Sequence, residues 1–241
     1  AAGVGSAGDG ATAGGGPPRP RVLSRPVLGV LLLAVAGQMP TGLYDALWSR
    51  LLTDRGADPF LIGLSLTIFG IPFVLLAPLG GRVAARRSPL VWAAFSLVLA
   101  AGFMASYGFV RSPVVITILG TFEACAQAVV VPGGYAATSL VFPDRWAATG
   151  QGWFSGAGTA SAGVAAVAGA PVYAAAGPGV VFAGGAGVSA LFALASVGVA
   201  GGLAGRRRPE PAPGGPGRAP VPVSDALPAH VPGNASETVT E

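Results

Sequence analysis

Long apolar stretches alternate with short polar turns along most of the chain. Two of these stretches carry no charge at all, between Ser88 and Val110 and between Pro178 and Gly205, and each exceeds the roughly 20 residues that a helix needs to cross a hydrocarbon core. Apolar and polar positions do not alternate as they do in the strands of a membrane barrel. The pattern predicts an all-α integral membrane protein with six transmembrane helices, at about 26–51, 59–82, 89–110, 113–142, 145–176 and 178–205.

Three of the predicted helices begin with the same local signal, a capping residue followed by proline. The pairs are Asp58-Pro59, Ser88-Pro89 and Ser112-Pro113. An Asp or Ser side chain can accept a hydrogen bond from a free N–H of the first turn, and proline suits the first helical position. Inside a helix proline removes a hydrogen bond. We therefore expect a kink at Pro40 and a break at Pro132-Gly133-Gly134.

Composition supports a membrane environment. Hydrophobic residues make up 52% of the chain and charged residues 10%, against about 25% charged in soluble domains. The net charge of +4 does not indicate a nucleic-acid partner, because the basic residues lie in short groups at helix ends. All of them are Arg, which is typical of a GC-rich bacterial genome. Cys125 is the single cysteine and His230 the single histidine, so we expect no metal site and no cofactor.

The arginines also predict a topology. If both ends of the chain are cytoplasmic, that side holds eleven of the fourteen arginines, and the outside keeps Arg50, Arg55 and Arg111. The positive-inside rule favours this orientation. The predicted organisation is a disordered cytoplasmic linker at 1–25, a six-helix transmembrane domain at 26–205 and a disordered cytoplasmic tail at 206–241, with the protein in the bacterial plasma membrane.

A carboxylate lies deep in the predicted span 113–142. Glu123 is ten residues from the start of that span, about 15 Å along the helix. A carboxylate there costs at least roughly 2.5 kcal/mol and is tolerated only toward the bundle interior or a wet cavity. Gly120, Glu123 and Gln127 share one helical face. Glu123 is either part of a substrate or proton pathway, or a structural acid hydrogen-bonded to a neighbouring helix.

A second polar stripe lies in the first predicted helix. Gln38, Thr41 and Asp45 fall on one face at i, i+3 and i+7. Two polar stripes on different helices are the pattern expected where a water-accessible pathway runs between them. Asp45 could instead cap the outer end of its helix or pair with Arg50.

Glycines four residues apart recur in the last two predicted helices. The pairs are Gly152 and Gly156, Gly198 and Gly202, and Gly201 and Gly205. Small residues at this spacing let membrane helices approach closely, so we expect these faces to be packing surfaces.

The segment from Pro78 to Pro89 reads PLGGRVAARRSP and resembles the loop signature of the major facilitator superfamily. Gly81 matches the leading glycine, Arg86 the conserved arginine and Arg87 a later basic position, and Ala85 stands where the family has an aspartate. Similar matches occur at Tyr44–Trp48, Gly56–Leu64 and Pro143–Gly152, so the resemblance covers roughly 26–208. It implies one half of a major-facilitator-type bundle, the C-terminal six-helix half, with a gating loop that contains Gly81, Arg82, Arg86 and Arg87. The alternative is that the three arginines act only as topology signals.

The resemblance further implies a secondary active transporter for a small solute. The buried carboxylate Glu123, with Asp45 as a second candidate, favours proton coupling, and a cavity poor in charge favours efflux of a small, largely apolar drug or metabolite. The partners of such a transporter would be the lipid bilayer, a small-molecule substrate, and the N-terminal six-helix half or a second copy. Without lysine there is no nucleotide-binding Walker motif, and no nucleophile–base pair is visible, so we do not expect an enzyme. The alternative is a six-helix membrane scaffold or partner subunit that does not transport.

Overall fold

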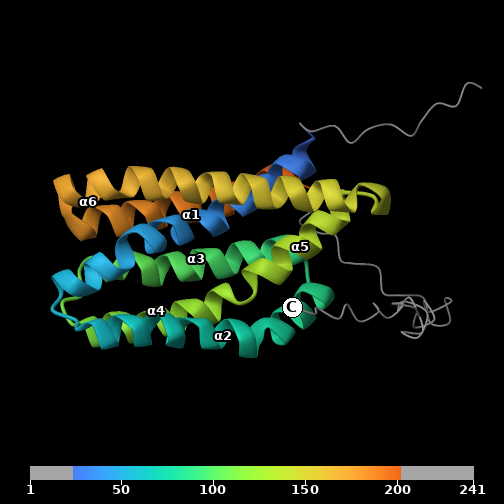
Figure 1. Ribbon diagram of the computed structural model, residues 1–241. Helices are drawn as coiled ribbons and strands as arrows, with labels where there is room; N and C mark the ends of the chain where they lie inside the picture. The colour runs from blue at the N-terminus through green and yellow to red at the C-terminus, as the bar shows by residue number, and fades with distance from the viewer. Residues whose placement is uncertain (1–23, 202–241) are drawn as a thin grey trace, which may run out of the picture. The chain divides into compact units, whose positions relative to one another are not determined.

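The computed structural model describes residues 24–201. Every regular element in this range is helical, in the order α1 (Arg25–Asp54), α2 (Pro59–Arg86), α3 (Pro89–Tyr107), α4 (Pro113–Gln127), α5 (Val130–Val141), a 3-10 turn η1 (Asp144–Trp146) and α6 (Ala147–Ala200) (Figure 1). Five helical segments are long and apolar enough to cross a membrane, with α4 and α5 together forming one of them. The predicted linker at 1–25, apart from its last two residues, and the predicted tail at 206–241 lie outside the described residues.

The predicted helix starts agree with the structure, although only two of the three caps form. The Asp58 carboxylate accepts a hydrogen bond from the backbone N–H of Leu61 at 2.7 Å, and the Ser112 hydroxyl accepts one from Val115 at 3.4 Å. Ser88 precedes α3 but its side chain makes no cap, and its hydroxyl oxygen is buried without a partner among the described residues.

The element α6 contains 54 residues and corresponds to the fifth and sixth predicted helices, which meet at a kink at Gly177 as the sequence predicts. A straight helix of that length would extend about 80 Å, far more than one membrane crossing requires. The helix is interrupted at Gly177, where φ is +83° and ψ is 173°. Glycine adopts this conformation at little cost because it has no Cβ. The interruption divides α6 into a first arm (147–176) and a second arm (178–200).

Both arms of α6 pack against α1, in opposite directions. Figure 1 shows the yellow first arm and the orange second arm joined at one end of the bundle. From the start to the end of the first arm, the neighbouring residues on α1 have increasing residue numbers. Along the second arm their residue numbers decrease. The close approaches are Gly158 to Gln38, Gly169 to Leu43 and Leu47, Gly185 to Leu43, and Ala200 to Gly29. α1 therefore packs mainly against the two arms of α6.

A proline inside α1 is compensated by a serine of α6. Pro40 has no N–H, so the carbonyl oxygen of Ala36, four residues earlier, loses its helical donor. The hydroxyl of Ser189, which is buried, donates a hydrogen bond to this oxygen at 2.7 Å. The preceding carbonyl, that of Val35, accepts a bond at 3.2 Å from Ser161 on the first arm, whose hydroxyl also lies 2.7 Å from the Gly158 carbonyl oxygen. Each arm of α6 is thus hydrogen-bonded to the backbone of α1 at the level of its proline.

We expect Ser189→Ala to lower the free energy of unfolding by about 1–2 kcal/mol, because it leaves the buried Ala36 carbonyl without a donor. Unfolding of the purified protein in mixed micelles by increasing denaturing detergent measures this loss. Ser139→Ala is the matched control, since Ser139 is exposed and bonds only to Ala136 of its own helix. Equal stability of the two variants would contradict the compensation of Pro40 by Ser189.

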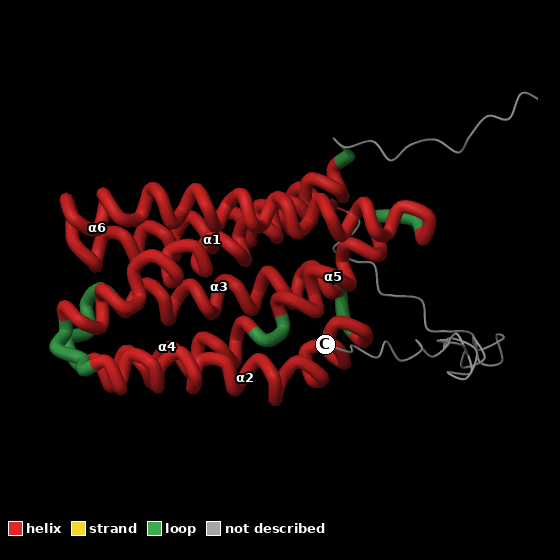
Figure 2. The backbone as a smooth tube through the Cα atoms, viewed as in Figure 1, coloured by secondary structure: helices red, strands yellow, loops and turns green. Residues whose placement is uncertain are grey.

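The predicted break is present but displaced: residues 132–134 are helical, and the interruption lies at residues 128 and 129, between α4 and α5 (Figure 2). The cause is again a proline. Pro132 cannot donate to the carbonyl of Ala128, and its ring would collide with that carbonyl in a regular helix. Gly80 of α2 lies against this point, because a Cβ at Gly80 would be 2.8 Å from the Ala128 oxygen.

The glycine pairs expected to mediate helix packing do not do so within the described chain. No described atom lies within 4 Å of the position that a Cβ would take at Gly152, Gly156 or Gly198, and Gly202 and Gly205 lie outside the described residues. Close packing occurs instead at other glycines, several of which lie where α1 meets the arms of α6. These are Gly29 and Gly42 on α1, and Gly158, Gly169 and Gly185 on α6.

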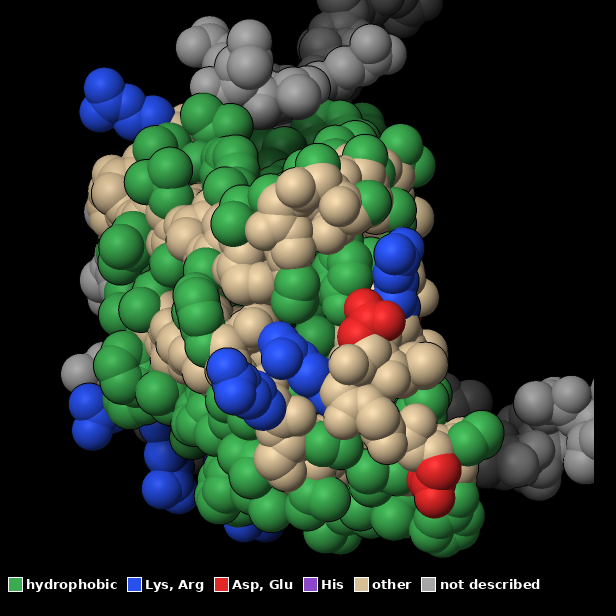
Figure 3. Space-filling model, turned by 90° about the vertical axis from the view of Figure 1, so that its left-hand side faces the viewer, with side chains coloured by type: hydrophobic (Ala, Val, Ile, Leu, Met, Phe, Trp, Pro, Cys, Tyr) green, Lys and Arg blue, Asp and Glu red, His purple; other side chains and the backbone are tan. Residues whose placement is uncertain are grey.

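Charged side chains gather at the end of the bundle where α1 meets α2, amid a largely hydrophobic surface (Figure 3). The Tyr173 hydroxyl donates to the Asp54 carboxylate at 2.7 Å, and the Arg50 guanidinium lies 5.1 Å from the centre of the Tyr173 ring. Arg55 donates to the carbonyl of Gly108 at 2.7 Å. These contacts occupy Arg50, which the sequence offered as a partner for Asp45.

Candidate functional site

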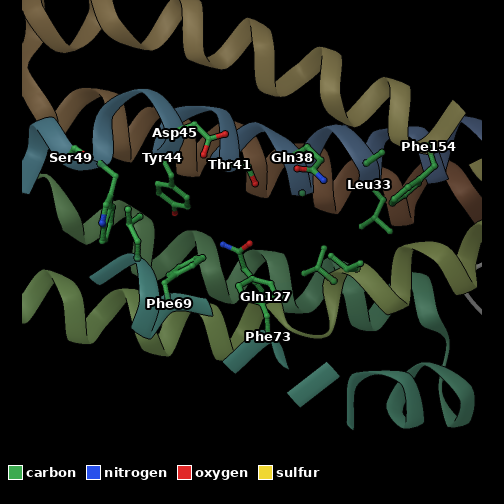
Figure 4. Close-up of a pocket in the computed structure, with 16 residues that line it drawn as sticks. Leu33, Gln38, Thr41, Tyr44, Asp45, Ser49, Phe69, Phe73, Gln127 and Phe154 are labelled. Carbon is green, nitrogen blue, oxygen red and sulfur yellow. The ribbon is translucent and has the colours of Figure 1, made fainter. Parts of the chain in front are cut away.

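A cavity of about 400 Å³ lies between α1, α2, α4, α5 and the first arm of α6. Figure 4 shows α1 on one side of it, with Thr41 and Tyr44 facing Gln127 and Phe69 across the gap. The wall is mainly apolar. Its aromatic residues are Tyr44, Trp48, Phe69, Phe73 and Phe154, and its polar residues are Gln38, Thr41, Asp45, Ser49 and Gln127.

The α1 side of the wall follows from helical periodicity. Residues at 34, 37, 38, 41, 44, 45 and 48 line the cavity, and this spacing of three and four keeps them on one face. The structure thus brings the predicted stripe of Gln38, Thr41 and Asp45 into the same cavity as Gln127 of α4. Asp45 itself is exposed.

Glu123 is almost completely buried, with 1% of its surface exposed. Its Oε1 accepts hydrogen bonds from the Tyr44 hydroxyl at 2.5 Å and from the Gln127 amide at 2.5 Å. Its Oε2 accepts a hydrogen bond from the Tyr107 hydroxyl. The carboxylate therefore has three donors from α1, α3 and α4, which offset the cost of removing it from water.

Aromatic rings enclose this carboxylate. The Tyr44 and Phe182 rings stack with centroids 6.4 Å apart, and the Tyr107 ring meets the Trp48 ring edge-on at 5.4 Å. Gly120, one turn before Glu123, makes room for Trp48, because a Cβ there would lie 3.2 Å from that ring. The Trp48 indole N–H donates to Ser65 of α2 at 2.9 Å, which fixes the ring against the cavity.

Glu123 lies one side-chain layer behind the cavity wall. It is not among the residues that line the cavity, whereas two of its donors, Tyr44 and Gln127, are. Any group in the cavity therefore meets the carboxylate through the Tyr44 hydroxyl or the Gln127 amide. This arrangement can hold a proton or a negative charge beside a site for an apolar molecule.

The predicted gating loop is not a loop. Gly81, Arg82 and Arg86 lie within α2, and Arg87 is its C-terminal cap. The helix continues past the predicted end at Arg82 to Arg86. All four residues are exposed, and within the described chain none of them lines the cavity. The Arg87 guanidinium lies 5.7 Å from the centre of the Trp92 ring.

Sequence reasoning missed the two tyrosines that bind Glu123. Tyr44 could have been found, since it continues the face of Gln38 and Thr41 by one turn. Tyr107 gives no such signal, because it lies at the C-terminal end of an uncharged helix and meets Glu123 only through the packing of α3 against α4.

Comparison with known families adds one finding. The family model described as Major Facilitator Superfamily matches residues 28–232, which is most of the chain and includes nearly all of the described helical bundle. Neither a curated protein nor a solved structure matches the chain.

Proposed function

The chain belongs to the major facilitator superfamily, and on that premise we propose that it is one six-helix half of a secondary active transporter that moves a small solute across the membrane. Members of this family are multi-pass membrane transporters, and the five apolar helical segments agree with that class. The two arms of α6 supply the fifth and sixth crossings. The partner is the N-terminal six-helix half or a second copy, which closes the cavity from its open side.

The proposed orientation puts both ends of the chain in the cytoplasm of a bacterial cell. The basic residues support it, because Arg82, Arg86 and Arg87 lie together at one end of α2 while Asp58 begins the other end. In this orientation Gly81 and these arginines face the cytoplasm, where they regulate opening by contact with the partner half.

The proposal of proton coupling depends on one observation. Glu123 is buried next to the cavity and accepts hydrogen bonds from two residues that line it. An ionised carboxylate only accepts hydrogen bonds, and its three donors suit that state. A protonated carboxyl group must donate one. The Gln127 amide nitrogen cannot accept it, so either a tyrosine hydroxyl turns or the Gln127 amide rotates to present its oxygen.

A change in the protonation of Glu123 affects the cavity through the Tyr44 hydroxyl or the Gln127 amide, because Tyr107 does not line the cavity. When Glu123 gains a proton, either the Tyr44 hydroxyl accepts the new hydrogen bond and directs its own proton elsewhere, or the Gln127 amide rotates. The cavity wall then presents a different polar surface to the solute. The free energy of proton binding is in this way linked to solute binding, as coupled transport requires.

The test is solute flux in proteoliposomes that contain the complete protein encoded by the reading frame of this chain. We expect an imposed pH gradient to drive accumulation of at least one compound from a panel of small apolar solutes, and collapse of the gradient by a protonophore to stop it. Absence of flux for every compound, with folded protein in the vesicles, would favour the non-transporting scaffold instead.

A further inference from the structure

Within residues 24–201, one charged side chain lines the cavity. Among the described residues that line it, Asp45 is acidic and none is basic. The remaining polar groups in the wall are neutral amides and hydroxyls. The charge of Glu123 is held behind the wall by three donors, so it does not act as a free anion inside the cavity. An occupant of the cavity therefore meets one unbalanced negative charge.

The nearest arginines along α1 do not neutralise Asp45. The Arg50 guanidinium lies over the Tyr173 ring at 5.1 Å, and Arg55 donates to the carbonyl of Gly108 at 2.7 Å. Both contacts are at the end of the bundle, beyond the cavity. Asp45 is also exposed, so its carboxylate is free to meet a ligand.

The rest of the wall suits a positive charge on an apolar body. The Tyr44 and Phe69 rings have centroids 6.3 Å apart, and those of Phe69 and Phe73 are 5.6 Å apart, so three neighbouring rings line the same cavity as Asp45. Aromatic faces attract cations through the ring quadrupole, most strongly where water is excluded. The volume, about 400 Å³, is within the range of sites for drug-sized molecules.

We propose that this cavity binds a monovalent organic cation with an aromatic or branched apolar body, with Asp45 as its counter-ion and the rings of Tyr44, Phe69 and Phe73 around the charged centre. This rests on the proposed transport function, and it names the class of solute. A neutral compound gains nothing from Asp45, and an anion is repelled by it, so the charge of the solute determines selectivity. The quaternary or delocalised cations that fit best are weakly hydrated, so they lose little when they leave water.

The test compares two probes of the same shape and opposite charge, tetraphenylphosphonium and tetraphenylborate, by equilibrium dialysis against the purified full chain in detergent. We expect tetraphenylphosphonium to bind at least about tenfold more tightly than tetraphenylborate, and Asp45→Asn to weaken its binding by about tenfold or more. Asp58→Asn is the matched control. It removes the same charge outside the cavity and keeps the cap of α2, because Asn caps as well as Asp, so binding should be unchanged.

Partition of each probe into protein-free micelles of the same detergent is measured and subtracted before the two probes are compared. This partition is the same for every variant, so the difference between variants reports the cavity alone. Equal binding of the two probes, or unchanged binding in Asp45→Asn with an unaltered unfolding midpoint, would overturn the cation assignment. If the cation assignment fails in this way but a pH gradient still drives flux of neutral compounds, the proposed transport function is retained. Conversely, Asp45-dependent binding without any flux would support the cation site and count against transport.

Discussion

Gradient-driven flux is expected to fall to the level of empty vesicles in Glu123→Gln. The substitution keeps the shape of the side chain, and its amide oxygen can still accept from Tyr44 and Gln127. The new NH2 group faces Tyr107, whose hydroxyl can turn to accept. What the variant loses is the ability to bind and release a proton, and with it the link between the pH gradient and the cavity. Solute accumulation in proteoliposomes under an imposed pH gradient measures the effect.

Two controls separate loss of coupling from loss of fold. Exchange of labelled for unlabelled solute at equal pH needs no net proton movement, so Glu123→Gln should retain it. Asp54→Asn removes an acid at the end of the bundle, where it accepts from Tyr173, and should transport normally. If Glu123→Gln still accumulates solute within about twofold of the unmodified protein, proton coupling through this residue is wrong and the carboxylate is structural.

The largest loss of stability is expected from Gly42→Ala. A Cβ at this position would lie 2.0 Å from the carbonyl oxygen of Ala162, and its other close neighbours are backbone atoms of the same residue. Backbone cannot turn aside as a side chain can, so α1 and the first arm of α6 have to separate. Both the packing and the nearby bond from Ser161 to Val35 are then weakened. We expect a loss of about 3 kcal/mol or more in the free energy of unfolding.

Gly102→Ala is the matched control, because no described atom lies within 4 Å of a Cβ there. Alanine is favoured over glycine inside a helix by roughly 0.5–1 kcal/mol, so this variant should be slightly more stable than the unmodified protein. Titration of both variants with denaturing detergent measures the two changes in the free energy of unfolding, which we expect to have opposite signs. A Gly42→Ala variant as stable as Gly102→Ala would show that the two helices do not approach closely at this point.

The sequence by itself determined what depends on neighbours along the chain. Long uncharged stretches predict membrane helices, because no soluble fold could cover so much apolar surface. The caps at Asp58 and Ser112 follow from a residue and the proline after it. The pairing of Glu123 with Gln127 follows from their separation of four residues, which places them one above the other on any helix.

Predictions from local sequence signals were wrong where the structural effect of a residue occurs at a different position in the chain. Pro132 interrupts the helix at Ala128 rather than at its own position, because the carbonyl four residues earlier is the one that loses its donor. The glycine pairs in α6 have the right spacing for close packing, but spacing does not say which face meets a neighbour. Gly42 packs because α1 lies between the two arms, and nothing near it in the sequence indicates this.

The tertiary structure alone decided which groups surround Glu123. Tyr44 is 79 residues from it in the chain and Tyr107 is 16 residues away, and both come from other helices. Its position behind the cavity wall, with Tyr44 and Gln127 between, depends on the rotation of α4 relative to α1. Periodicity fixes which residues share a face of one helix. Which face turns toward which neighbour is settled by the packing of side chains across helices, and that packing involves the whole bundle at once.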